Sequence, residues 1–262
     1  MRRHLHAPSL FLASLVGVGC VAAPIDEVPP TVELGPTGAT SLAPSPPTSG
    51  EEGPRDPSQT WVVLLGTGTP GAEPDRFGPS TAIVAGGNAY VIDAGPGVVR
   101  RAAAGAIVSG LTALQPANLR VAFFTHLHSD HTLGYPDLIL SPWVLGRSEP
   151  LRTYGPPGLE AMTTALLEAY REDIRARVEG PEQLRRDLLD VQTHEVEPGL
   201  IYDDDVLRVE AFAVPHGTWD HAYGFKLMTA DRTVVMSGDT GPFDGLADIA
   251  EGADVLIHEA YG

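Results

Sequence analysis

The segment 123–131 constrains the fold and the chemistry of this chain more than any other part of its sequence. It reads Phe123-Phe124-Thr125-His126-Leu127-His128-Ser129-Asp130-His131, so three histidines and an aspartate follow directly on an apolar run. The apolar run predicts a buried strand that ends here. Because side chains two apart in an extended chain project to the same side, His126 and His128 are placed to share one metal ion. Asp130 and His131 follow on the next turn, where they can reach a second ion.

Zinc is the metal that this set of side chains favours, because it accepts both neutral imidazole nitrogen and carboxylate oxygen. The chain has one cysteine, Cys20, so it can form neither an internal disulfide nor a zinc site built from several cysteines. A water shared by two zinc ions loses its proton near neutral pH and becomes a nucleophile. The sequence therefore predicts a hydrolase with two zinc ions, in which Asp130 is also required for turnover.

Short apolar or alternating runs after residue 60 predict a mixed α/β domain. The predicted strands are 61–65, 81–85, 90–93, 121–125, 206–214, 223–228, 233–237 and 255–257. Apolar residues recur at helical spacing from Leu159 to Ile174 and again, after a break at Pro181, from Leu184 to Leu189. This spacing predicts two helices whose apolar stripe packs on the core.

The first 60 residues are predicted to lie outside the folded domain. Residues 1–20 combine two arginines with a short apolar run, which is typical of a signal peptide and indicates export to the periplasm or cell envelope. Cys20 is placed as in a bacterial lipoprotein signal and, if lipidated, would attach the protein to a membrane; the alternative is ordinary cleavage near Ala23. Residues 21–60 are rich in proline and are interpreted as a disordered linker, so the folded domain is expected at 61–262.

The charge balance argues against a nucleic-acid partner. Seventeen Lys and Arg face 34 Asp and Glu, and the formal net charge of -17 repels phosphate backbones unless a basic patch compensates. The arginines between residues 171 and 186 could form such a patch, but they are interleaved with acidic residues and are interpreted as a solvated helix face. We therefore expect a small-molecule or ester substrate and no nucleic acid.

The pattern His-x-His-x-Asp-His resembles the signature of the metallo-β-lactamase superfamily, and the resemblance extends over residues 61–262. Further matching motifs are Leu65-Gly66-Thr67-Gly68-Thr69-Pro70, Val91-Ile92-Asp93-Ala94-Gly95, Val214-Pro215-His216-Gly217 and Ser237-Gly238-Asp239-Thr240. The resemblance implies that Asp93 braces the ligand loop, that His216 completes the first zinc site and that Asp239 touches both ions. His221 competes with His216 but lacks a preceding strand. The implied fold is a four-layer αββα sandwich with the metals at one edge of two facing sheets.

Within the superfamily the sequence resembles ribonuclease Z and its phosphodiesterase and arylsulfatase-like relatives. The motifs concerned are Tyr154-Gly155-Pro156-Pro157-Gly158, Tyr223-Gly224-Phe225-Lys226 and Ile257-His258-Glu259-Ala260. The resemblance implies that His258 assists proton transfer at the leaving group, although Tyr261 replaces the threonine of the family motif. The best-known subclass of true β-lactamases carries a cysteine where Asp239 stands, which favours an ester over an antibiotic as the substrate.

The segment between His216 and Asp239 bears on the kind of ester. In ribonuclease Z enzymes that mature tRNA, a long basic arm lies between the corresponding motifs. Residues 217–238 instead predict two strands with a tight turn near Ala230 and Asp231, and their cations are Lys226 and Arg232. We therefore expect that this protein does not mature tRNA.

The end of the chain bears on the second zinc site. Relatives of this kind supply one more histidine to the second zinc, on a strand beyond the His-Glu-Ala motif, whereas this chain ends at Gly262. The second site then lacks one ligand. We expect the sequence to be a fragment, truncated at the C-terminus, because an uncovered sheet edge would otherwise remain.

These observations lead to one principal hypothesis and two alternatives. The principal hypothesis is an exported zinc-dependent hydrolase of phosphodiester or sulfate ester bonds that attacks with a metal-bound hydroxide. The first alternative is a ribonuclease Z-type tRNA 3′ endonuclease, which would require a different interpretation of the N-terminus. The second alternative is a non-catalytic metal-binding module.

Overall fold

The computed structural model describes residue 56 and residues 58–260. The predicted signal peptide, Cys20 and most of the predicted linker lie outside these residues, as do Tyr261 and Gly262. The end of the linker is tied to the folded domain, because Thr60 Oγ1 donates a hydrogen bond of 2.6 Å to Asp231 Oδ1.

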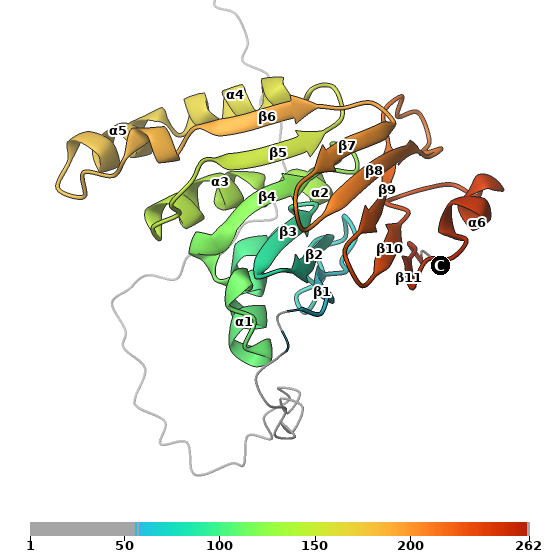
Figure 1. Ribbon diagram of the computed structural model, residues 1–262. Helices are drawn as coiled ribbons and strands as arrows, with labels where there is room; N and C mark the ends of the chain where they lie inside the picture. The colour runs from blue at the N-terminus through green and yellow to red at the C-terminus, as the bar shows by residue number, and fades with distance from the viewer. Residues whose placement is uncertain (1–55, 57, 261–262) are drawn as a thin grey trace, which may run out of the picture. The chain divides into compact units, whose positions relative to one another are not determined.

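Six strands form the first sheet (Figure 1). In spatial order they are β1 (Trp61–Gly66), β2 (Ser80–Ala85), β3 (Asn88–Ile92), β4 (Leu119–Phe123), β5 (Leu151–Gly155) and β6 (Val191–Glu195). The first three are antiparallel to one another, and β3 through β6 are parallel. The carboxyl ends of β3 and β4 therefore lie side by side at one edge of the sheet.

Five strands form the second sheet. In spatial order they are β11 (Val255–Ile257), β10 (Thr233–Met236), β9 (Tyr223–Met228), β8 (Arg208–Ala213) and β7 (Gly199–Asp203). Both β8 and β10 are antiparallel to β9, and β11 is parallel to β10. The carboxyl ends of β8, β10 and β11 therefore point the same way.

Side chains along the central strands of the first sheet alternate between its two faces and so contribute to two separate hydrophobic cores. Ile83, Ile92 and Phe123 face the second sheet and belong to a buried cluster between the two sheets. Val84 and Val91, which alternate with them, belong to a second cluster on the outer face of the first sheet. Because successive side chains of a strand point to opposite faces, a strand buried on both faces is apolar throughout.

Helices cover the outer face of each sheet (Figure 1). The helices are α1 (Val98–Ser109), α2 (Ser129–Thr132), α3 (Tyr135–Val144), α4 (Leu159–Ala169), α5 (Arg171–Glu179) and α6 (Gly245–Ala250), with 3₁₀ turns at Thr112–Leu114, Pro116–Asn118 and Arg186–Leu188. Residues of α1, α3 and α4 pack into the outer cluster of the first sheet. Lys226 points away from the inter-sheet core and donates to the Ile249 carbonyl of α6 at 3.3 Å. The layers are thus helix, sheet, sheet and helix, which confirms the predicted αββα sandwich.

No helix in residues 58–260 combines the length and the apolarity that crossing a membrane requires.

Local sequence predicted some elements and missed others. All eight predicted strands are present with small shifts at their ends, but β5, β6 and β7 were not predicted. The two predicted helices are placed differently, because the break falls at Tyr170, between α4 and α5. The segment between Pro181 and the start of β6 forms only a 3₁₀ turn. The apolar spacing from Leu184 to Leu189 reflects loop residues that pack on the core rather than a helix.

Candidate metal centre

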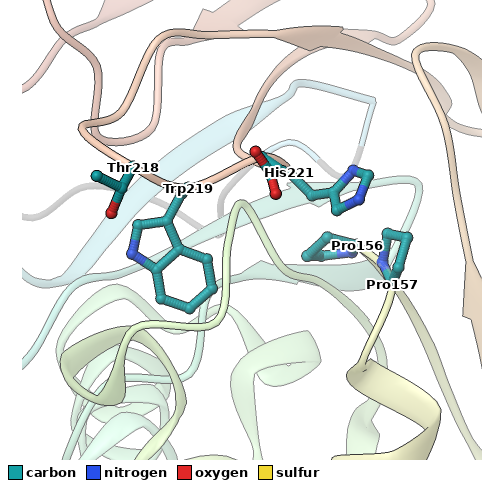
Figure 2. Close-up of a pocket in the computed structure, with 6 residues that line it drawn as sticks. Pro156, Pro157, Thr218, Trp219 and His221 are labelled. Carbon is teal, nitrogen blue, oxygen red and sulfur yellow. The ribbon is translucent and has the colours of Figure 1, made fainter.

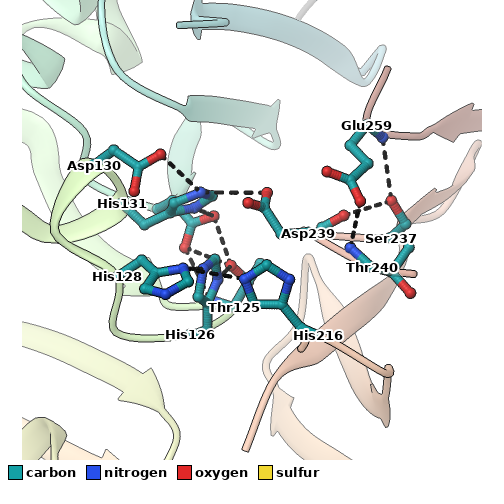
Figure 3. A network of polar contacts seen from close by, with 12 residues as sticks. Thr125, His126, His128, Asp130, His131, His216, Ser237, Asp239, Thr240 and Glu259 are labelled. Carbon is teal, nitrogen blue, oxygen red and sulfur yellow. Dashed lines mark hydrogen bonds and ion pairs between the residues drawn. The ribbon is translucent and has the colours of Figure 1, made fainter. Parts of the chain in front are cut away.

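Five strand ends converge on one edge of the sandwich. Asp93 follows β3, and the segment Thr125–His131 follows β4. From the second sheet, His216 follows β8, Asp239 follows β10 and His258 follows β11. Two backbone hydrogen bonds hold these loops together, from Tyr223 N to Thr125 O at 2.9 Å and from Gly241 N to Pro215 O at 2.6 Å. The candidate ligands therefore meet at this edge, and Figure 3 shows the side chains of His128, His131, His216 and Asp239 directed toward one another.

Asp93 fixes the ligand loop from behind. Its backbone is left-handed, with φ 58°, which is uncommon for a residue other than glycine. Its carboxylate accepts hydrogen bonds from Thr125 N at 2.8 Å, from Thr125 Oγ1 at 2.9 Å and from His131 Nδ1 at 2.8 Å. These contacts bear out the expectation that Asp93 braces the loop, and they fix the tautomer and orientation of His131.

Three imidazoles form a first compact group. His126 Nε2 lies 2.9 Å from His128 Nδ1, and His216 Nε2 lies 3.1 Å from the same atom. The opposite nitrogen of the His126 ring contacts Thr125 Oγ1 at 3.0 Å, which turns Nε2 toward the other two rings. Three ring nitrogens that converge in this way match the ligand set of a tetrahedral metal site with one open position.

A second compact group consists of His126, His131 and Asp239. His131 Nε2 is buried and has no hydrogen-bond partner among the described residues. It lies 3.3 Å from Asp239 Oδ1 and 3.7 Å from Asp130 Oδ2, which are ion-pair distances. Because His131 already donates from Nδ1 to Asp93, its other nitrogen presents a lone pair toward two carboxylates. This arrangement fits a cation held between them.

The electrostatics of the histidines support the same conclusion. Burial, together with the neighbouring His131, lowers the pKa of His126 to about 4, so its ring is neutral and can donate a lone pair at pH 7. Burial also tends to lower the pKa of His131, but the nearby carboxylates of Asp93 and Asp239 outweigh it and raise that pKa to about 10. The site around His131 therefore favours a positive charge, which a bound metal would supply.

Gly238 allows Asp239 to approach the histidines. Its φ is 62°, and a β-carbon there would lie 2.7 Å from the Tyr223 carbonyl oxygen. Only glycine fits both this backbone conformation and this space at position 238. The loop is also held by Glu259, whose Oε1 accepts a hydrogen bond from Thr240 N at 2.7 Å.

One cavity of about 860 Å³ adjoins both groups. Its lining includes His128, Asp130, His131, His216, Asp239 and His258. His126 lies beneath, fully buried. Asp130 belongs to neither compact group and adjoins the second one through His131, whereas His126 is shared by both groups. His258 is exposed in the cavity and donates from Nδ1 to the Glu259 carbonyl. The structure thus brings all of the sequence-predicted ligands to one place.

Two contacting residues were missed in the sequence. Trp219 donates from its indole nitrogen to His128 Nε2, and Glu259 holds the Asp239 loop. A loop tryptophan carries no periodic signal, whereas Glu259, next to His258, was part of a recognised motif and could have been found.

Known proteins of one superfamily share this sequence and fold. Residues 88–262 match the family described as beta-lactamase superfamily domain. A ribonuclease Z from Mycobacterium sp. (strain KMS) is 40% identical over 202 residues, covering 76% of this chain and 68% of that protein. A ribonuclease Z from Mycobacterium bovis (strain BCG / Pasteur 1173P2) is 36% identical over 200 residues, covering 75% and 69%.

Two solved structures show the same fold at lower identity. The short form of human tRNase Z gives a TM-score of 0.59 at 23% identity, covering 78% of this chain and 79% of that one. The metallo-beta-lactamase fold protein YhfI from Bacillus subtilis gives 0.56 at 15% identity, covering 75% and 69%.

The expectation of no nucleic-acid partner is wrong, because relatives at 40% identity bear the name ribonuclease Z. The net charge misled for a physical reason. It sums the charges of all 262 residues and says nothing of how they are distributed around one site. It also leaves out any metal ion that the candidate ligands would hold, which would be the largest local charge at the site.

Three observations point to the same superfamily. They are the strand order, the two groups of candidate ligands and the family match of residues 88–262. The chain belongs to the metallo-β-lactamase superfamily of hydrolases, in the branch that includes the ribonuclease Z proteins.

Proposed function

We propose that this protein is a zinc-dependent phosphodiesterase that cleaves RNA, in the manner that the name of its ribonuclease Z relatives implies. The observation that carries the proposal is the meeting of two compact ligand groups in a chain that is 40% identical to a ribonuclease Z. This proposal replaces a small-molecule ester as the principal substrate. Export through residues 1–20 stays a prediction, and fractionation of cells that express the full chain would test it.

In this proposal the ligands divide between two ions. His126, His128 and His216 would hold the first ion through the three nitrogens that converge. His131 and Asp239 would hold the second, with Asp130 beside them. Nitrogen and carboxylate donors without a thiolate suit zinc, and the two ligand groups adjoin one another at His126.

The residues of this chain supply orientation and proton transfer. Bound metal ions would lower the pKa of a water and neutralise charge on a phosphoryl oxygen. Asp93 holds His131 and Thr125 in place, so the ligand geometry exists before the substrate arrives. Because His258 Nδ1 donates to a carbonyl, Nε2 is the nitrogen left to exchange a proton in the cavity. His258 is therefore our candidate for the acid at the leaving oxygen.

An RNA cleavage assay tests the proposal. The full chain, loaded with zinc, is incubated with a 3′-extended precursor tRNA, with an unstructured RNA and with a chromogenic phosphodiester. We expect the wild type to cut RNA and His126→Ala to lose that activity. The matched control is His194→Ala, because His194 is an exposed histidine on β6 that stacks on Tyr154 away from the cavity.

Three results would contradict the proposal. The wild type could leave both RNAs intact, His126→Ala could cut as well as the wild type, or His194→Ala could lose activity to the same extent. Cleavage of the chromogenic diester without cleavage of RNA would instead support the small-ester hypothesis drawn from the sequence.

A further inference from the structure

A second cavity lies beside the metal centre and contains none of the proposed ligands. Its volume is about 280 Å³, and it is lined by Pro156, Pro157, Thr218, Trp219, Asp220 and His221. Figure 2 shows the indole of Trp219 on one side and His221 with the two prolines on the other. Pockets for small-molecule ligands have volumes of roughly 300–1,000 Å³. This cavity is therefore suited to a single ring system rather than to a chain of nucleotides.

One wall of the cavity is the turn that joins β5 to α4. Pro156 and Pro157 form this turn, and Glu195 at the end of β6 fixes it. Glu195 Oε1 accepts hydrogen bonds from Gly158 N at 2.7 Å and from Glu160 N at 3.1 Å. The proline faces are consequently in place before anything binds, which reduces the entropic cost of binding.

The opposite wall is the loop after His216. Trp219 N donates to the His216 carbonyl at 3.0 Å, and the two residues form an isolated β-bridge. His221 Nδ1 lies 3.5 Å from the hydroxyl of Tyr223. The loop that carries a proposed zinc ligand therefore also carries both aromatic rings of the cavity.

Trp219 connects the cavity to the metal centre. Its ring centroid lies 4.6 Å from that of His128 at an interplanar angle of 81°, and its Nε1–H donates to His128 Nε2. A ring bound in the cavity therefore lies one indole away from His128. A nucleotide whose phosphate reaches the metal centre could place its base here.

The charge and shape of the lining identify the occupant. Among the residues that the structure describes, no lysine or arginine lines the cavity and Asp220 does, so a phosphate group does not fit there. Flat faces from Trp219, His221 and the prolines suit an uncharged planar ring, and proteins that read single-stranded RNA stack unpaired bases on such side chains. We propose that this cavity binds a nucleobase of the RNA substrate next to the scissile phosphate, an inference that rests on the proposed function.

A binding experiment tests this subsite without requiring turnover. The affinity of the zinc-loaded full chain is measured for adenosine 5′-monophosphate and for ribose 5-phosphate, which carries the same phosphate but no base. We expect the base-containing ligand to bind at least about 10-fold more tightly, in line with the contribution of one stacked base. Trp219→Ala should remove this preference and Trp219→Phe should keep most of it. Tyr170→Ala, which removes an exposed aromatic ring at the end of α4, should leave it intact.

A second measurement uses only the wild type, in case a Trp219 variant does not fold. An 8-azido derivative of adenosine 5′-monophosphate is cross-linked by light, and the labelled peptide is identified by mass spectrometry. Labelling of the segment 216–223 or of the turn at Pro156 and Pro157 supports the subsite. Equal affinity for the two ligands, a preference that survives in folded Trp219→Ala, or labelling confined to other segments would overturn it.

The two proposals fail in different ways. A base preference in a protein that cuts no RNA would contradict the proposed function and leave the subsite standing. Metal-dependent RNA cleavage without any base preference would contradict the subsite alone.

Discussion

His131 Nε2 lies 3.3 Å from Asp239 Oδ1, with no hydrogen-bond partner in the part of the chain that the structure describes. Asp93 accepts from the other nitrogen of the ring at 2.8 Å, so the neutral ring presents a lone pair to a carboxylate. Two electron-rich groups at this distance repel each other unless a cation lies between them. That cation is a proton in metal-free protein and, in our proposal, a zinc ion in the active enzyme.

The stability of metal-free protein is expected to pass through a maximum near pH 6.5. The pKa of His131 is raised to about 10 from 6.5, so its stabilising contribution is complete below pH 6.5 and is lost as the pH rises toward 10. The pKa of His126 is lowered to about 4, so its contribution is complete above pH 6.5 and is lost as the pH falls toward 4. Thermal unfolding of chelator-treated protein across this range measures both effects.

Zinc should flatten the alkaline side of that profile, because the ion takes the place of the proton between His131 and Asp239. His131→Asn should flatten it as well. A metal-free profile that keeps rising from pH 7 to 10 would be incompatible with the charge distribution around His131.

Asp93→Asn should weaken metal binding without unfolding the domain. An amide cannot accept all the hydrogen bonds that the carboxylate receives from Thr125 and His131, so the ligand loop loses its orientation. Loss of such an indirect contact typically reduces metal affinity by about 10- to 100-fold. Competition with a fluorescent chelator measures this affinity, with Asp190→Asn, which alters an exposed pair with Arg186, as the control. Equal affinities in the two variants would refute the bracing role.

Asp130→Ala should abolish turnover and leave the fold intact. The only side-chain contact that the structure gives the Asp130 carboxylate within residues 58–260 is the 3.7 Å ion pair with His131. Its removal should therefore cost the second ion rather than a structural contact. Turnover on RNA and the melting temperature are measured together, and a folded variant with near-normal rates would show that Asp130 is not needed.

Arg147→Met should destabilise the domain without affecting the metal centre. Arg147 is fully buried and donates to the carbonyls of Leu138, Ile139 and Glu149 at 3.1–3.2 Å. Its loss leaves these acceptors unsatisfied, and we expect a decrease of about 3 kcal/mol in the free energy of unfolding. The control is Arg100→Met, whose exposed pair with Asp137 at 3.5 Å should contribute under about 1 kcal/mol. Urea unfolding of both variants decides, and a similar small loss in each would contradict the role of Arg147.

Part of the fold was predictable because the hydrophobic pattern of a strand runs directly into the candidate metal ligands that begin at His126. The run before His126 is apolar on both faces, as a strand between a helix layer and another sheet must be. By contrast, β6 has the sequence Val191-Gln192-Thr193-His194-Glu195, which is largely exposed, and it exists because its backbone pairs with β5. The break between α4 and α5 occurs at Tyr170 without proline or glycine, so no local signal marks it.

The candidate site was predictable to the extent that its residues are close in sequence. Four candidate ligands lie within residues 126–131, and their spacing alone predicted a shared site. His216 and Asp239 came from the resemblance to a family, because a single loop histidine or aspartate carries no distinguishing pattern. Trp219 belongs to the site because it contacts His128, which is 91 residues away in the sequence, and no periodicity encodes such a contact.

The zinc content of purified full-length protein tests the metal centre most directly. His126 belongs to both compact groups, whereas His216 belongs to the first group only and His131 to the second only. Elemental analysis should find zinc in the wild type and in His194→Ala, and a reduced amount in His126→Ala, in His216→Ala and in His131→Ala. The first site, with three imidazoles, should retain its zinc longer than the second during dialysis against a chelator. Wild-type protein without zinc above background, or undiminished zinc in His126→Ala, would contradict the proposed centre.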